Sequence, residues 1–104
     1  MSWEVRAKLA DLPPGGAAHI DGGPYGLCVV RIGDDFYALD DRCSHQNWPL
    51  SEGEVDPLSR TIECTKHGST FSLVDGAPQC LPATQRVATY PVRVEGEELV
   101  VEVP

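Results

Sequence analysis

Two short segments in the middle of this chain each combine a cysteine with a histidine. The first segment has the pattern Cys43-x-His45 and the second has Cys64-x-x-His67, with residues 46–63 between them. Thiolates and neutral imidazoles are both good ligands for transition metals, and together the two segments supply four donors. Segments this far apart in sequence share a metal site only if the fold brings two loops together. The pattern therefore predicts a rigid scaffold that holds two ligand-bearing loops against each other.

The residues on both sides of these segments predict short β-strands. Nine prolines and ten glycines in 104 residues predict frequent turns. Alternating or continuous apolar runs predict strands over residues 3–9, 17–20, 27–32, 36–39, 61–63, 70–74, 87–94 and 99–103. No segment has the period of a long amphipathic helix, and residues 51–58 predict one helical turn at most. We therefore expect a single all-β domain over residues 1–104, with antiparallel sheets and a loop-rich insert over about residues 40–84.

The charge balance limits the partners that this chain can have. Sixteen acidic and eight basic residues give a net charge of −8. This surplus argues against nucleic acid and against anionic membrane surfaces, because both carry negative charge. It is compatible with a partner that presents a basic patch, and equally with acidity that serves only solubility.

The sequence shows neither a signal peptide nor a membrane span, and this predicts the compartment. The amino-terminal residues have no apolar signal-peptide core, and no run approaches the roughly 20 apolar residues of a membrane span. We therefore expect a soluble, cytoplasmic protein with no membrane contact. In that compartment four cysteines favour metal binding over disulfides.

Two kinds of metal centre can use two cysteines and two histidines. A [2Fe–2S] cluster needs two protein ligands on each iron, and one thiolate and one imidazole from each loop would clamp it from opposite sides. The thiolates would then hold an inner iron and the imidazoles an outer iron near the surface. Structural zinc accepts the same donors, but zinc fingers usually present a cysteine pair followed by a histidine pair. The alternating order in this chain departs from that spacing, which argues against zinc.

The motif resembles that of the Rieske family, in which a C-x-H pair precedes a C-x-x-H pair. Gly68-Ser69 also matches the family's common extension of the second pair. The resemblance covers most of the chain, since the expected flanking strands fall where a Rieske domain has them. It implies the fold of Rieske iron–sulfur proteins, in which a loop-rich subdomain binds the cluster. It also implies one Rieske-type [2Fe–2S] cluster, bound by Cys43, His45, Cys64 and His67.

The same resemblance implies four residues around the cluster, namely Ser69, Trp48, Phe71 and Pro82. Ser69 stands where a family serine donates to a bridging sulfide, and Pro82 lies in a segment like the proline-containing loop that covers the cluster. High-potential members carry two further cysteines joined by a disulfide, and Trp48 and Lys66 occupy those positions here. Phe71 replaces a tyrosine that donates to a ligand thiolate in those members. Fewer donors to sulfur predict a potential in the lower part of the roughly −150 to +300 mV range of Rieske centres.

Three residues of the same types remain outside the predicted site. Cys28 lies in an apolar run and is expected in the core, whereas Cys80 is expected to pack in the proline-containing loop. A disulfide between them is disfavoured by the compartment. His19 is expected to be structural or exposed. Because His19 is the one histidine left, the chain cannot form the 2-His-1-carboxylate iron site of an oxygenase. It is therefore not expected to be an enzyme.

The sequence allows two roles for Trp48, which precedes Pro49. It either shields the cluster from water or forms an apolar tip for transient docking, which uses small interfaces.

The resemblance and the size of the chain imply a monomeric ferredoxin, an electron-transfer component. It would take single electrons from a flavin-dependent reductase and pass them to a terminal non-haem iron oxygenase or a similar acceptor. The alternative is a Rieske protein that serves iron–sulfur assembly or acts as the small subunit of a reductase. A third hypothesis is a zinc-bound or apo interaction module, which would be colourless and silent in EPR.

Overall fold

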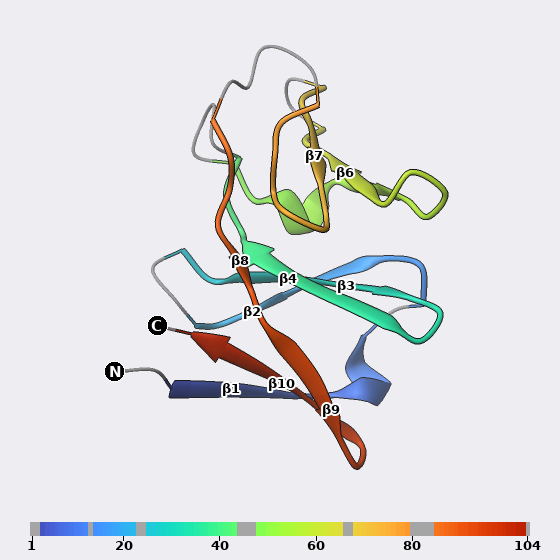
Figure 1. The fold of residues 1–104 in the computed structure, drawn as a ribbon, viewed down its shortest axis with the longest axis vertical. Coiled ribbons are helices and arrows are strands. Elements are labelled where there is room, and N and C mark those ends of the chain that lie inside the picture. The colour runs from blue at the N-terminus through green and yellow to red at the C-terminus, as the bar shows by residue number, and fades with distance from the viewer. Residues whose placement is uncertain are drawn as a thin grey trace.

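The protein folds into three antiparallel β-sheets (Figure 1). The computed structural model describes residues 3–12, 14–22, 25–43, 48–65, 68–79 and 85–103. All strand pairs in these residues are antiparallel, and the two helices among them are short 3-10 turns, η1 (Leu9–Asp11) and η2 (Leu50–Glu52). In the described ranges no helix has the length and apolarity needed to cross a membrane. The predicted all-β fold is confirmed.

The first sheet joins the two ends of the described chain. Its strand order is β1 (Trp3–Lys8), β10 (Glu98–Val103) and β9 (Val92–Glu95). β9 and β10 form a hairpin, in which Glu95 pairs with Glu98 across a two-residue turn. Gly96 in this turn has φ 62°, a left-handed conformation that glycine adopts without strain.

The second sheet is the middle layer of the molecule. Its order is β2 (Ala17–Ile20), β3 (Leu27–Ile32), β4 (Asp35–Asp40) and β8 (Thr89–Tyr90). On β3, Leu27 and Val29 pack into a cluster shared with the first sheet, while Cys28 and Val30 pack into a cluster on the opposite side. Both faces of β3 are therefore covered, which explains why its sequence is continuously apolar rather than alternating.

The third sheet stands at the end of the molecule away from β1 and β10 (Figure 1). Its order is β5 (Glu54–Asp56), β6 (Thr61–Glu63) and β7 (Thr70–Ser72). Its apolar side chains Ile62 and Phe71 are fully buried in the same cluster as Cys28 and Val30. The layer between the second and third sheets also contains both cysteines of the predicted site.

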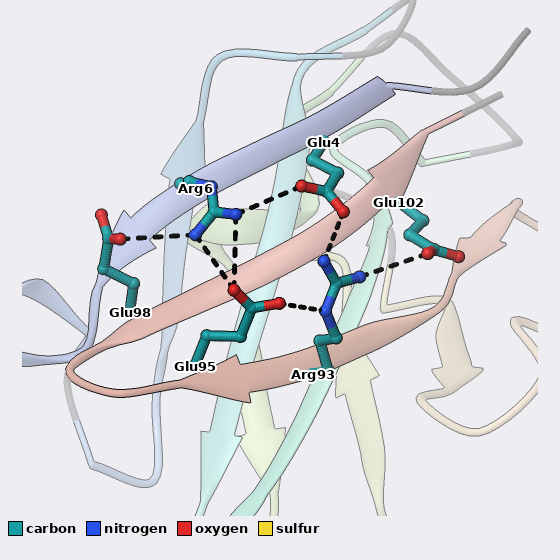
Figure 2. A network of polar contacts seen from close by, with 6 residues as sticks. All are labelled: Glu4, Arg6, Arg93, Glu95, Glu98 and Glu102. Carbon is teal, nitrogen blue, oxygen red and sulfur yellow. Dashed lines mark hydrogen bonds and ion pairs between the residues drawn. The ribbon is translucent and has the colours of Figure 1, made fainter.

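The outer face of the first sheet carries a network of ion pairs (Figure 2). Arg6 and Arg93 flank the fully buried Val100 in the strand register, and each guanidinium contacts several carboxylates. The pKa values of Glu4 and Glu95 lie below the ordinary range, in each case chiefly because of a hydrogen bond from Arg93. The members are Glu4, Arg6, Arg93, Glu95, Glu98 and Glu102. These groups are about 40–50% exposed, so each pair adds little stability and the network mainly marks this face as a solvent face.

The structure differs from the predicted elements in three places. The strand predicted over 87–94 is wrong, because β8 and β9 are separated at Pro91 and belong to different sheets. Pro91 has no N–H to donate, so it cannot continue the pairing of β8 with β4. Its carbonyl oxygen instead accepts a 2.9 Å bond from the Glu102 N–H in β10, and the chain enters the first sheet there. The one helical turn allowed within residues 51–58 is the 3-10 turn η2, which begins at Leu50, but the strand β5 after it was not predicted. The strand predicted over 70–74 ends at Ser72.

Candidate metal centre

Cys43 and Cys64 lie in the same core layer, between the second and third sheets. Both are 0% exposed, and both belong to the cluster that includes Leu50 and Ile62. The structure thus brings together the two cysteines that the sequence separates by twenty residues, 44–63. The remaining predicted residues His45, His67 and Pro82, together with Lys66 and Cys80, lie outside the described residues.

The first cysteine begins a loop that a backbone hydrogen bond closes. Cys43 follows β4, and its N–H donates to the Trp48 carbonyl oxygen at 2.8 Å. The Trp48 side chain is partly buried and packs against the core cluster, and Leu50 next to it is fully buried. Both ends of the first loop are therefore held by the core.

The second cysteine begins a loop that closes in the same way. Cys64 follows β6, and its N–H donates to the Ser69 carbonyl oxygen at 2.7 Å. The Gly68 N–H donates back to the Cys64 carbonyl oxygen at 2.8 Å, and Gly68 has φ 73°, which suits glycine. In each loop the cysteine N–H thus bonds the carbonyl five residues later. The sequence could not reveal this shared closure, because Trp48 and Ser69 contribute only backbone atoms to it.

Two of the residues predicted around the cluster are fully buried. Ser69 and Phe71 are both 0% exposed, and Phe71 belongs to the same core cluster as the two cysteines. Residues 77–79 run beside β7, with bonds from Ser72 N–H to the Ala77 carbonyl oxygen at 2.9 Å and from Gln79 N–H to the Thr70 carbonyl oxygen at 2.6 Å. This pairing encloses Phe71 and fixes the strand that follows the second loop.

The chemistry of these two cysteines fits an iron–sulfur cluster. Cys28, Cys43 and Cys64 are free thiols, so no disulfide among them competes with metal binding. Cys28 lies within β3 opposite His19, and burial raises the pKa of its thiol, so it has the character of a core residue as predicted. Cys43 and Cys64 instead begin loops, and a water-excluded layer with two soft thiol donors matches the inner iron of a [2Fe–2S] cluster.

One group of polar residues near the first loop was not predicted. The carboxylate of Asp41 accepts bonds from the Ser51 N–H and the Ser51 hydroxyl, both at 2.6 Å, and lies 2.5 Å from the His19 Nδ1 atom. The Asp40 carboxylate next to it accepts from the Tyr90 hydroxyl. The sequence did contain a signal for this group, namely two adjacent acids at the end of a buried strand. A buried carboxylate requires hydrogen-bond donors, so such a pair predicts polar partners nearby.

The comparisons with known proteins agree with this chemistry. The family model of the Rieske [2Fe-2S] domain matches residues 2–91. The 3-phenylpropionate/cinnamic acid dioxygenase ferredoxin subunit of Escherichia coli (strain K12) is 43% identical over 96 residues, covering 92% of this chain and 89% of that protein. The ferredoxin of carbazole 1,9a-dioxygenase from Nocardioides aromaticivorans IC177 is 38% identical, with a TM-score of 0.89 over 94% of this chain and 95% of that chain.

A third similarity comes from a solved assembly. A chain in the complex of reduced oxygenase and oxidized ferredoxin in carbazole 1,9a-dioxygenase is 36% identical. The two structures superpose with a TM-score of 0.81 over 90% of this chain and 95% of that one. Together with the two buried cysteines, these similarities establish that the chain belongs to the Rieske [2Fe–2S] family, as a ferredoxin that carries electrons on one Rieske-type cluster and is not itself the catalytic component.

Proposed function

We propose that Cys43 and Cys64 bind one iron of the cluster and that His45 and His67 bind the other. The burial of both thiols in one layer supports the first half of this set, and the place of each histidine in the sequence, two or three residues after its cysteine, supports the second. When bound, the cluster takes up and releases one electron. The protein holds the thiolates away from water by burying them between two sheets.

We infer that residues 40–84 form the cluster-binding subdomain within a single domain of residues 1–104. The strands β5, β6 and β7 pair only with one another among the described strands, which supports a separate unit. The shared core cluster between this sheet and the second sheet supports a rigid attachment to the rest of the domain.

We propose that the protein carries electrons from a flavin-dependent reductase to a terminal oxygenase. The observation that carries this proposal is that the relatives at 36–43% identity are dioxygenase ferredoxins, one of them solved with its oxygenase. On the third sheet Glu54 and Glu63 are exposed and directly opposite each other. Like charges at such positions are destabilising, and a basic patch on a partner would relieve the repulsion.

The experiment that tests this role is electron delivery in a reconstituted system. A flavin-dependent reductase, its pyridine nucleotide, this protein and an aromatic-ring oxygenase are combined, and product formation is followed. We expect turnover that requires this protein, and a higher apparent KM for the Glu54→Gln/Glu63→Gln variant. Glu97→Gln in the exposed β9–β10 turn is the matched control, with an unchanged KM. A reducible cluster with no turnover in any oxygenase system would favour iron–sulfur assembly or a reductase subunit instead.

We further infer a cytoplasmic monomer. The ionic outer face of the first sheet and the net charge of −8 both support a protein that remains separate from its own copies. Size-exclusion chromatography with light scattering distinguishes the 11.3 kDa monomer from a dimer.

We infer a reduction potential in the lower part of the Rieske range. Phe71 lies fully buried in the layer of the two thiols, and it has no hydroxyl to donate to a thiolate. We expect Phe71→Tyr to raise the midpoint potential, because a hydrogen bond to sulfur stabilises the added negative charge of the reduced state. Phe71→Leu is the control and should produce no rise. An EPR redox titration measures both, and a wild-type midpoint above about +100 mV would contradict the inference.

A further inference from the structure

Asp41 carries a carboxylate that the protein buries completely. Its side chain is 0% exposed, whereas the carboxylates of the network on the first sheet are about half exposed. A buried carboxylate is tolerated only where donors and a positive partner compensate for the lost water. Asp41 also lies two residues before Cys43, a separation of at most about 7 Å of chain. A charge at this position would therefore be close to a cluster bound by Cys43.

The bonds of Asp41 close the first loop a second time. Its carboxylate accepts hydrogen bonds from both the N–H and the hydroxyl of Ser51. Ser51 lies in η2, on the other side of the loop. The Asp41 N–H donates to the Gly26 carbonyl oxygen at 3.0 Å. The Cys43–Trp48 backbone bond therefore lies inside a larger ring that Asp41 and Ser51 close. In this way one side chain fixes both ends of the loop that carries Cys43.

His19 connects this carboxylate to solvent. Its Nδ1 atom lies 2.5 Å from Asp41, and its Nε2 atom lies 3.3 Å from the fully exposed Asp21. The imidazole packs against Gly26, where a Cβ atom would lie 2.3 Å from the His19 Cε1 atom. The ring is thus held in one orientation by two hydrogen bonds and a close backbone contact. It is nevertheless 49% exposed, so protons can reach it.

We propose that His19 is a positioning residue for the cluster, which acts through Asp41 by supplying the positive charge that this buried carboxylate needs beside the Cys43 loop. This inference rests on the ligand set proposed above. A charged His19 cancels the negative charge of Asp41 near the cluster. A neutral or missing imidazole leaves that charge uncompensated, and the reduced state, which is the more negative one, becomes less favourable.

The direction of the pH dependence follows from the same contact. The pKa of His19 is raised, chiefly by its hydrogen bond to Asp41 and further by the one to Asp21, against the opposing effect of desolvation. The compensating charge is therefore present below this raised pKa and is lost as pH rises through it. The midpoint potential should fall over that interval, and the free energy of unfolding should fall with it.

The other titratable groups around His19 have a weaker influence. Cys28 lies opposite it in the strand register, and its thiol stays neutral because burial raises the pKa of that group. The hollow of the surface beside His19 is lined by further charged side chains. These are Arg6, Lys8, Asp11 and Glu98. All four lie on the solvent side, where water and salt screen them, whereas the Asp41 carboxylate is enclosed.

The first test uses the wild-type protein. Its visible and EPR spectra show whether the cluster is present, which separates this inference from the proposed ligand set. We expect the pKa of His19, followed by NMR, to be higher in reduced than in oxidised protein, because the electron added to the cluster attracts the proton. Equal pKa values in the two redox states would overturn the proposal.

The second test compares three variants by redox titration between pH 5 and 9. His19→Asn retains a neutral donor near the Nδ1 position, so the cluster should assemble with unchanged EPR features. Below the pKa of His19 and at a fixed applied potential, its ratio of reduced to oxidised protein should fall roughly sixfold, the scale for one charge about 10 Å away at an effective dielectric of about 30. His19→Lys should restore the ratio without the pH inflection. Asp21→Asn removes the second hydrogen bond that raises the pKa of His19, so it should retain the potential at low pH and move the inflection to lower pH.

The outcomes of these titrations are distinct. A His19→Asn variant that keeps the wild-type potential and its inflection would show that another group titrates, and the proposal would be wrong. If the wild-type protein itself shows no EPR signal of a reduced Rieske centre, the proposed cluster ligands are wrong instead. If His19→Asn fails to fold, the wild-type NMR comparison still decides the matter.

Discussion

Cys43→Ala and Cys64→Ala should each yield a colourless protein without the rhombic EPR signal of a reduced Rieske centre. Each replacement removes one of the two thiolates proposed for the inner iron, and both positions are closed to solvent. Because metal binding and folding are coupled in small domains, both variants should also unfold at lower temperature than the loaded wild-type protein. Iron and sulfide analysis, visible absorption and EPR measure the loss, and electron delivery to an oxygenase should fall to background.

Cys28→Ala is a closely matched control for these variants. Cys28, Cys43 and Cys64 are each 0% exposed and belong to one core cluster, so the three changes remove the same kind of atom from the same layer. Cys28 is in the middle of a strand rather than at the start of a loop, so its variant should retain the full iron content. A colourless Cys28→Ala protein, or a Cys43→Ala protein with a complete cluster, would contradict the proposed ligand set.

Gly53→Ala should destabilise the protein by about 3 kcal/mol or more, which corresponds to a decrease in Tm of more than about 10 °C for a domain of this size. A Cβ atom at residue 53 would lie 1.9 Å from the Glu63 carbonyl oxygen and 3.0 Å from the Leu50 carbonyl oxygen. Both neighbours are backbone atoms, so the chain itself must move. Glu63 directly precedes Cys64, and Leu50 follows the first loop, so the same displacement should separate the two thiols and lower the iron content.

Gly96→Ala separates this steric effect from the general cost of replacing a glycine. Gly96 has φ 62° and no heavy atom within 4 Å of the position of a Cβ, so its replacement should cost about 1–2 kcal/mol through backbone strain alone. Thermal unfolding followed by circular dichroism measures both variants. A Gly53→Ala protein as stable as Gly96→Ala would show that the backbone around Glu63 adjusts easily.

The predictable part of the fold consists of features encoded in neighbouring residues. The strands over residues 17–20, 27–32 and 61–63 were predicted with the bounds that the structure has, because each is an apolar or β-branched run with turn residues beside it. The strand predicted over 87–94 failed because apolar content does not show which sheet a strand joins. Pro91 interrupts the pairing, and the chain on either side bonds to different neighbours, β4 and β10. The short strand β5 was missed because Val55 is its one apolar residue.

The order of the cysteines and histidines and the β-rich pattern around them were determined by the sequence alone, because ligand chemistry depends on residue type and strand formation depends on local pattern. Only the tertiary structure decided how the first loop is held. The His19–Asp41–Ser51 bonds join residues 22 and 10 positions apart, and the contact of Gly53 with Glu63 depends on how β5 pairs with β6. Such contacts follow from the packing of whole sheets, and no local pattern records them.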